Sequence, residues 1–101
     1  MVLKEDLMFG SFLEELSTLD TEDLQSVWNH VLPLMTKQGF TTETKMPGAD
    51  EEVRKVLIGW AKKLRDDQDL EGLIRVVGFL DGISKTRFRL DVAEYRKPSP
   101  R

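Results

Sequence analysis

The side chains that could carry out chemistry are few and scattered along this sequence. His30 is the only histidine and there is no cysteine, so neither a Cys–His nucleophile nor a thiolate metal site can be assembled. Acidic residues occur as three adjacent pairs: Glu14 and Glu15, Glu51 and Glu52, and Asp66 and Asp67. Helix capping and solvation explain such pairs. We therefore expect no catalytic residue, no cofactor and no metal site, and we expect that the protein is not an enzyme.

One acidic segment has the spacing of a metal loop. Asp67, Asp69 and Glu71 stand at alternate positions before Gly72, as oxygen ligands do at the start of a calcium-binding loop. The twelfth position, which should supply a bidentate glutamate, is Gly78. We interpret Asp69 instead as the N-cap of the helix that follows.

Helices must position any functional residue in this chain. Apolar residues recur every three or four positions in four segments, which are residues 7–16, 20–35, 50–65 and 70–83. Asp20 or Thr21 and Asp50 are the predicted N-caps of the second and third helices, and Gly39 can end the second. Pro33 predicts a kink or an early end near residues 29–32.

Composition is that of one folded domain. The chain has 101 residues, of which 40% are hydrophobic and 33% charged, and no apolar run approaches the roughly 20 residues of a membrane span. We predict a mainly α, small four-helix bundle over residues 1–97, with residues 98–101 as a frayed C-terminus. The first residues lack the features of a secretory signal, so we expect an intracellular protein of the cytoplasm or nucleus, with no membrane partner.

Two further segments allow a short strand pair. Residues 40–45 are rich in threonine, and residues 87–93 alternate between apolar and charged side chains. An isolated strand would leave its backbone groups unpaired, so these two segments are each other's candidate partner. Phe88, Val92 and Tyr95 also fit one face of a helix, which leaves a helical interpretation open.

The helix predicted over residues 70–83 has more apolar surface than one stripe can hold. Leu70, Leu73, Val76, Val77 and Leu80 make one stripe, while Ile74, Phe79 and Ile83 lie outside it. Either this helix is covered on two sides within its own bundle, or one side is a docking surface. We take Ile74, Phe79 and Ile83 as candidate partner-binding residues, and the alternative is that all three belong to the core. Gly72, Gly78 and Gly82 suggest close approach of another helix or side chain.

Charge is distributed unevenly along the chain. Residues 1–50 contain 3 Lys or Arg against 9 Asp or Glu, whereas residues 51–101 contain 12 against 9. The basic excess is strongest after Gly82, at Lys85, Arg87, Arg89, Arg96, Lys97 and Arg101. The first five are candidate contacts to phosphate or to an acidic partner, and a solvated terminus is the alternative.

The two helices on either side of the acidic segment are similar to those of a known domain. Asp50-Glu-Glu, Leu57, Trp60 and the run from Leu64 to Leu73 resemble the central helical hairpin of the C-terminal domain of the scaffold translesion DNA polymerase, a Y-family deoxycytidyl transferase. That resemblance covers about one third of the chain and implies a four-helix bundle that recruits other proteins by binding short peptides. The threonine-rich loop and the basic C-terminal segment depart from the family pattern, so no peptide-contacting residue is carried over.

Two functions follow from these patterns. The first is a non-catalytic protein–protein interaction module that docks a partner helix, a short peptide or a second copy of itself on an apolar helical surface, with a scaffold role in DNA damage tolerance implied by the resemblance. The second is a nucleic-acid-associated accessory protein that uses its basic C-terminal segment. The acidic overall balance favours the first.

Overall fold

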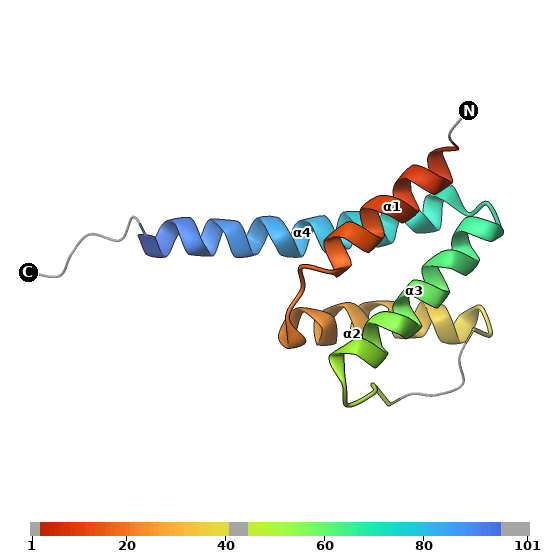
Figure 1. Cartoon of the computed structure of the whole chain (residues 1–101), viewed down its shortest axis with the longest axis horizontal. Helices are drawn as coiled ribbons and strands as arrows, with labels where there is room; N and C mark the ends of the chain where they lie inside the picture. The colour runs from red at the N-terminus through yellow and green to blue at the C-terminus, as the bar shows by residue number, and fades with distance from the viewer. Residues whose placement is uncertain (1–2, 41–44, 96–101) are drawn as a thin grey trace, which may run out of the picture.

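The four segments with helical spacing all form helices. The computed structural model describes residues 3–40 and 45–95, with side chains up to Lys85. Within this part of the chain lie α1 (Lys4–Leu16), α2 (Thr21–Lys37), α3 (Asp50–Asp66) and α4 (Leu70–Tyr95). α1 and α2 each pack against both α3 and α4, and Figure 1 shows α1 lying along the first half of α4. The predicted small four-helix bundle is confirmed.

One cluster of buried apolar side chains holds the bundle together. Each helix contributes to this core: Phe12 and Leu16; Leu24, Val27, Trp28, Val31 and Met35; Val53, Leu57, Trp60, Ala61 and Leu64; and Leu73, Val76, Val77 and Leu80. The indole Nε1–H of Trp60 donates a hydrogen bond of 2.8 Å to Gln38 Oε1 at the end of α2. The buried Nε1 of Trp28 has no hydrogen-bond partner in the described part of the chain.

Most of the predicted helix caps and helix ends are found in the structure. Asp20 caps α2 by accepting a 3.0 Å hydrogen bond from the Asp23 amide, and Asp69 accepts one of the same length from Gly72 at the start of α4. Gly39, at φ 71°, ends α2, and the Phe40 amide donates back to the Met35 carbonyl at 2.9 Å.

Asp50 is not a cap. Ala49 holds the cap position of α3, while the Asp50 carboxylate accepts a 2.6 Å hydrogen bond from the Thr21 hydroxyl. This contact joins the first turn of α2 to the first turn of α3.

Pro33 does not end its helix. α2 continues through Pro33 to Lys37, contrary to the expectation of early termination. Proline removes one backbone donor, whose acceptor would be the carbonyl of Asn29. Both residues are exposed, so that carbonyl can be hydrated, while Val31 and Met35 are buried and hold the helix to the core on either side.

The prediction of a short strand pair is wrong, because α4 occupies one of its two segments. This helix continues unbroken to Tyr95, so residues 87–93 are helical, and of the proposed partner segment 40–45, residues 41–44 lie outside the described residues. The alternation of apolar and charged residues therefore did not decide the conformation, and the helical interpretation of Phe88, Val92 and Tyr95 is the correct one. Residues 98–101 also lie outside the described part of the chain. None of the helices described is long and apolar enough to cross a bilayer.

Among the described residues, Gln68 and Gly39 have positive φ and provide a matched test of the helix ends. Gln68 adopts φ 58° after α3, in the position that Gly39 holds after α2. A side chain in this conformation is strained, and glycine is not. We expect Gln68→Gly to raise the free energy of unfolding by about 0.5–1 kcal/mol and Gly39→Ala to lower it by a similar amount.

Thermal unfolding followed by circular dichroism measures both changes. A shift of about 1 kcal/mol moves Tm by roughly 5 °C in a domain of this size. A Cβ at Gly39 would meet no atom within 4 Å, so the Gly39→Ala effect is conformational and not steric. Equal Tm values for the wild type and Gln68→Gly would contradict the expectation.

Candidate interaction surface

The three candidate partner-binding residues lie on two different sides of α4. Ile74 is 51% exposed, whereas Phe79 and Ile83 are half-buried and pack against the core. On a helix, Phe79 and Ile83 are about 40° apart, and Ile74 is about 140° or more from either of them. The buried stripe of Leu73, Val76, Val77 and Leu80 separates the two sides, so α4 does not bring the three residues together.

Phe79 faces α2. Its ring stacks on the His30 imidazole, with ring centroids 3.8 Å apart and ring planes 3° from parallel. His30 is exposed, but its imidazole also covers one face of the Phe79 ring. On this side of α4, the domain itself therefore covers part of the apolar surface of Phe79.

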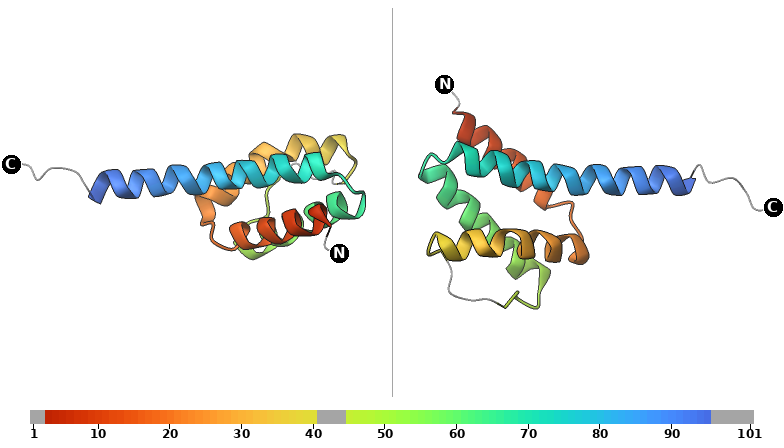
Figure 2. Two further views of the ribbon diagram at one scale, coloured as in Figure 1. Left: turned by 90° about the horizontal axis from the view of Figure 1, so that it is seen from above. Right: turned by 180° about the vertical axis from the view of Figure 1, so that it is seen from behind.

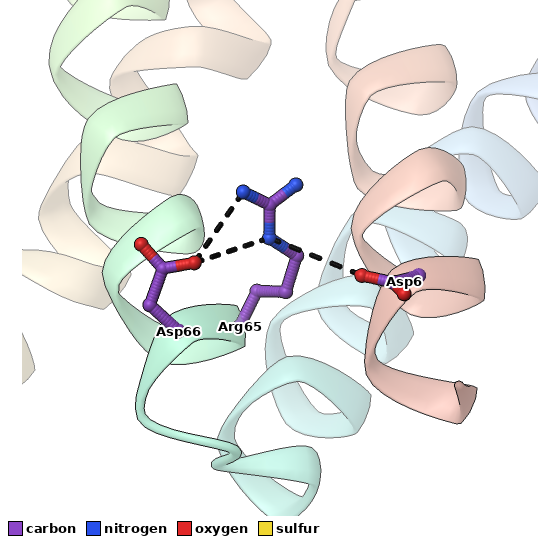
Figure 3. Close-up of polar contacts among 3 residues, drawn as sticks. All are labelled: Asp6, Arg65 and Asp66. Carbon is purple, nitrogen blue, oxygen red and sulfur yellow. Dashed lines mark hydrogen bonds and ion pairs between the residues drawn. The ribbon is translucent and has the colours of Figure 1, made fainter. Parts of the chain in front are cut away.

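Ile74 lies on the side of α4 that faces α1. Asp81 is only about 20° around the helix from Ile74, and the Asp81 carboxyl interacts with Glu15 of α1. Arg65, just before α4, lies over the Phe9 ring at 4.6 Å and is 4.0 Å from Asp6, so the start of α1 lies near the start of α4 (Figure 3). α1 and α4 therefore run in the same direction.

Exposed apolar residues of α1 accompany Ile74. Leu7 precedes Glu15 by about two turns, as Ile74 precedes Asp81, so Leu7 and Ile74 lie at the same level of the paired helices. Leu7 is 60% exposed and Leu3, one turn earlier, is 50% exposed. We call this region the α1–α4 surface and define it by Leu3, Leu7, Glu14, Glu15, Ile74 and Asp81.

The far end of the α1–α4 surface is acidic and hollowed. A hollow of about 310 Å³ is lined by Ser11, Glu14, Glu15, Thr18 and Ser84. Burial raises the pKa of the Glu15 carboxyl, and the Asp81 charge and a hydrogen bond with Asp81 raise it further. Asp81 has a lowered pKa, chiefly because it is hydrogen-bonded to Lys85, whose Nζ lies 2.9 Å away. Glu15 Oε2 is buried and has no hydrogen-bond partner among the described residues, so the Glu15 carboxyl of α1 is sensitive to the Asp81 charge of α4 here.

A second hollow lies at the other end of the bundle. It has a volume of about 210 Å³ and lies between the end of α2 and the start of α4, with Leu34, Gln38, Trp60, Asp69, Glu71, Gly72 and Arg75 around it. None of the residues predicted to bind a partner lines it. The sequence offered no signal for this hollow, because its walls come from three different helices.

The basic candidates differ in how far the structure describes them. Lys85 is exposed and paired with Asp81. Arg87 and Arg89 lie in α4 beyond the last described side chain, and Arg96 and Lys97 lie outside the described residues. In Figures 1 and 2 this second half of α4 extends away from the other three helices.

Carboxylates of the calcium-like segment are already engaged in the fold. Asp67 pairs with Lys63 at 2.6 Å, Glu71 pairs with Arg75 at 2.6 Å, and Asp69 caps α4. Among the residues described, no group of three or more His, Asp or Glu side chains is arranged to hold a metal ion.

The sequence did not reveal the exposed leucines of α1. Leu7 and Leu13 fit the apolar spacing of their helix, yet only Phe12 and Leu16 of α1 are buried. The width of the apolar arc on α1 could have indicated these exposed leucines, because the arc is wider than a single neighbouring helix can cover.

Comparison of the chain with known protein families, with curated proteins and with solved structures finds no match. The features of the α1–α4 surface must therefore be interpreted from its own residues.

The Glu15–Asp81 contact predicts how stability depends on pH. The folded state raises the pKa of Glu15 above 4.5, so it binds a proton more tightly than the unfolded chain does. That stabilisation is present below pH 4.5 and is lost as pH rises through the raised value. We expect Glu15→Gln, which keeps a neutral donor, to make the free energy of unfolding less dependent on pH between pH 4.5 and neutrality than it is in the wild type.

Urea unfolding at a series of pH values measures this dependence, and the exposed neighbour Glu14 provides the control. Glu14→Gln should keep most of the wild-type pH dependence, because Glu14 is exposed and its charge is the smallest of the contributions that raise the pKa of Glu15. Identical pH profiles for Glu15→Gln and the wild type would show that the carboxyl pair does not couple α1 to α4.

Proposed function

We propose that this domain is a non-catalytic protein-interaction module that docks a helix or short peptide of a partner on the α1–α4 surface. The observation that carries the proposal is the 51% exposure of Ile74 beside Leu73, which is fully buried. Single exposed apolar residues are common, but Ile74 lies level with exposed Leu7 on the adjoining helix. Apolar anchors of this kind receive a partner helix at other helical grooves.

Glycines beside Ile74 support the same function. A Cβ added at Gly78 or Gly82 would meet nothing within 4 Å, so the described bundle does not need these glycines for its own packing. Each costs on the order of 1 kcal/mol relative to alanine in a helix. Absence of a side chain there lets the backbone of a docked helix approach α4 closely. Gly72 differs, because an added Cβ would lie 2.7 Å from Asp69 Oδ2.

A scaffold role in DNA damage tolerance is the finer part of this proposal. It depends on the resemblance of the hairpin around Leu64 to Leu73, since the comparisons with known proteins offer no match. The described structure supports the coarser property, a helical bundle with an exposed apolar surface.

Peptide selection tests the interaction surface. A displayed library of amphipathic helical peptides would be selected on the wild-type domain, and recovered peptides would be measured by calorimetry against Ile74→Asp. We expect Ile74→Asp to weaken binding about tenfold or more, because a carboxylate would be desolvated in the contact. The domain itself should keep its helical circular dichroism, since Ile74 is half exposed.

Leu34→Asp is the matched control, because Leu34 is 38% exposed on α2, away from the α1–α4 surface. Selected peptides should bind it as they bind the wild type. Peptides that bind Ile74→Asp and the wild type equally well would contradict docking at Ile74, as would unfolding of the Ile74→Asp domain.

A second candidate function is nucleic-acid binding by the C-terminal segment. The observation that favours it is that α4 carries Arg87 and Arg89 into a part of the helix away from α1, α2 and α3 (Figure 1). Phosphate contacts of this kind release counterions, so affinity must fall as salt rises. We expect Arg87→Glu/Arg89→Glu to abolish duplex DNA binding if this function is correct. Fluorescence anisotropy measures it, and affinity that does not change with salt would exclude it.

A further inference from the structure

We infer that the α1–α4 surface binds the second half of α4 from a second copy of this chain, with the two α4 helices antiparallel. This inference rests on the proposed function and names the partner of the same surface. It depends on the length of α4, on the order of charged and apolar residues along it, and on the symmetry of the resulting pair.

α4 is longer than the bundle requires. It spans 26 residues, against 13 in α1 and 17 in each of α2 and α3. Among the α4 side chains that the structure describes, Ile83 is the last that packs against the core, and Figures 1 and 2 show the remaining turns of the helix leaving the other helices. A helix of a dozen residues is marginal in water without tertiary packing. The second half of α4 therefore benefits from a neighbour that its own described bundle does not supply.

The order of residues selects the antiparallel direction. Along α4, the basic residues Arg87 and Arg89 come first, and Val92 and Tyr95 follow. On the α1–α4 surface, the apolar residues Leu7 and Ile74 come first, and the acidic residues follow. An antiparallel arrangement places Arg87 and Arg89 toward the acidic residues of the other copy and Val92 and Tyr95 toward its apolar residues, while Asp91 and Glu94 stand next to Val92 and Tyr95.

The spacing agrees with this direction. Ile74 precedes Asp81 by seven residues, and Tyr95 follows Phe88 by seven. When position 88 lies opposite Asp81 of the other copy, Tyr95 lies opposite Ile74. Arg87 and Arg89 then flank the position of Asp81, next to the acidic hollow that Glu14 and Glu15 line.

Twofold symmetry makes this contact reciprocal. Each copy offers one α1–α4 surface and one projecting second half of α4, and an antiparallel pair uses both at once. The assembly closes as a dimer and leaves no free surface of this kind for further growth. Opposite charges along the contact also fit the uneven charge of the chain, which is acidic in its first half and basic after Gly82.

Sedimentation equilibrium of the whole chain tests the inference. The wild type should form dimers that dissociate on dilution and as salt is raised, because the charged contacts are screened. Glu14→Arg and Arg87→Glu/Arg89→Glu should each raise the dimer dissociation constant about tenfold or more. An equimolar mixture of these two variants should dimerise like the wild type, since one contact of the mixed dimer is native and the other has its charges exchanged.

Further variants separate this inference from the proposed function. Ile74→Asp should weaken the dimer and Leu34→Asp should not. A chain that is monomeric at all concentrations, or a mixture that fails to restore dimerisation, overturns the inference. Selected peptides that bind a monomeric chain through Ile74 would then leave the proposed function standing. A wild-type dimer lost with Ile74→Asp, together with no binding of any foreign peptide, would instead support self-association and overturn docking of a foreign partner.

Discussion

The fold depends on one buried stripe in the first half of α4. Leu73, Val76, Val77 and Leu80 are the buried residues of α4, and α1, α2 and α3 all contact this helix. Because this face is narrow, both of its flanks stay at the surface. α2 covers one flank through His30 and Phe79, while α1 reaches the other through Glu15 and Asp81. The two flanks therefore differ in how much of their apolar surface is covered.

Much of the fold follows from local sequence rules. Apolar spacing predicted all four helices, and the caps at Asp20 and Asp69 and the helix end at Gly39 follow from short-range hydrogen bonding. Local rules failed where a longer context decided the outcome. α2 continues past Pro33 because the core holds it on both sides, and residues 87–93 continue α4, although their alternation of apolar and charged side chains is typical of a strand.

The candidate site was less predictable than the fold. Apolar excess on α4 drew attention to Ile74, which is exposed, but the sequence could not show that Phe79 faces α2 or that His30 would stack on it. Leu7 fits the apolar pattern of its own helix, and only the position of α1 on α4 leaves it at the surface. Surface composition thus depends on contacts between helices, which a periodic pattern does not specify.

The two buried tryptophans differ in one respect that has a practical consequence. Trp60 donates its indole N–H to Gln38, whereas the buried indole N–H of Trp28 has no partner among the described residues. The emission wavelength of an indole ring depends on the polarity around it, so the two tryptophans should differ in emission maximum in the native domain. With no other tryptophan in the chain, the variants Trp28→Phe and Trp60→Phe would let intrinsic fluorescence follow the Trp60–Gln38 contact and the surroundings of Trp28 separately, without any added label.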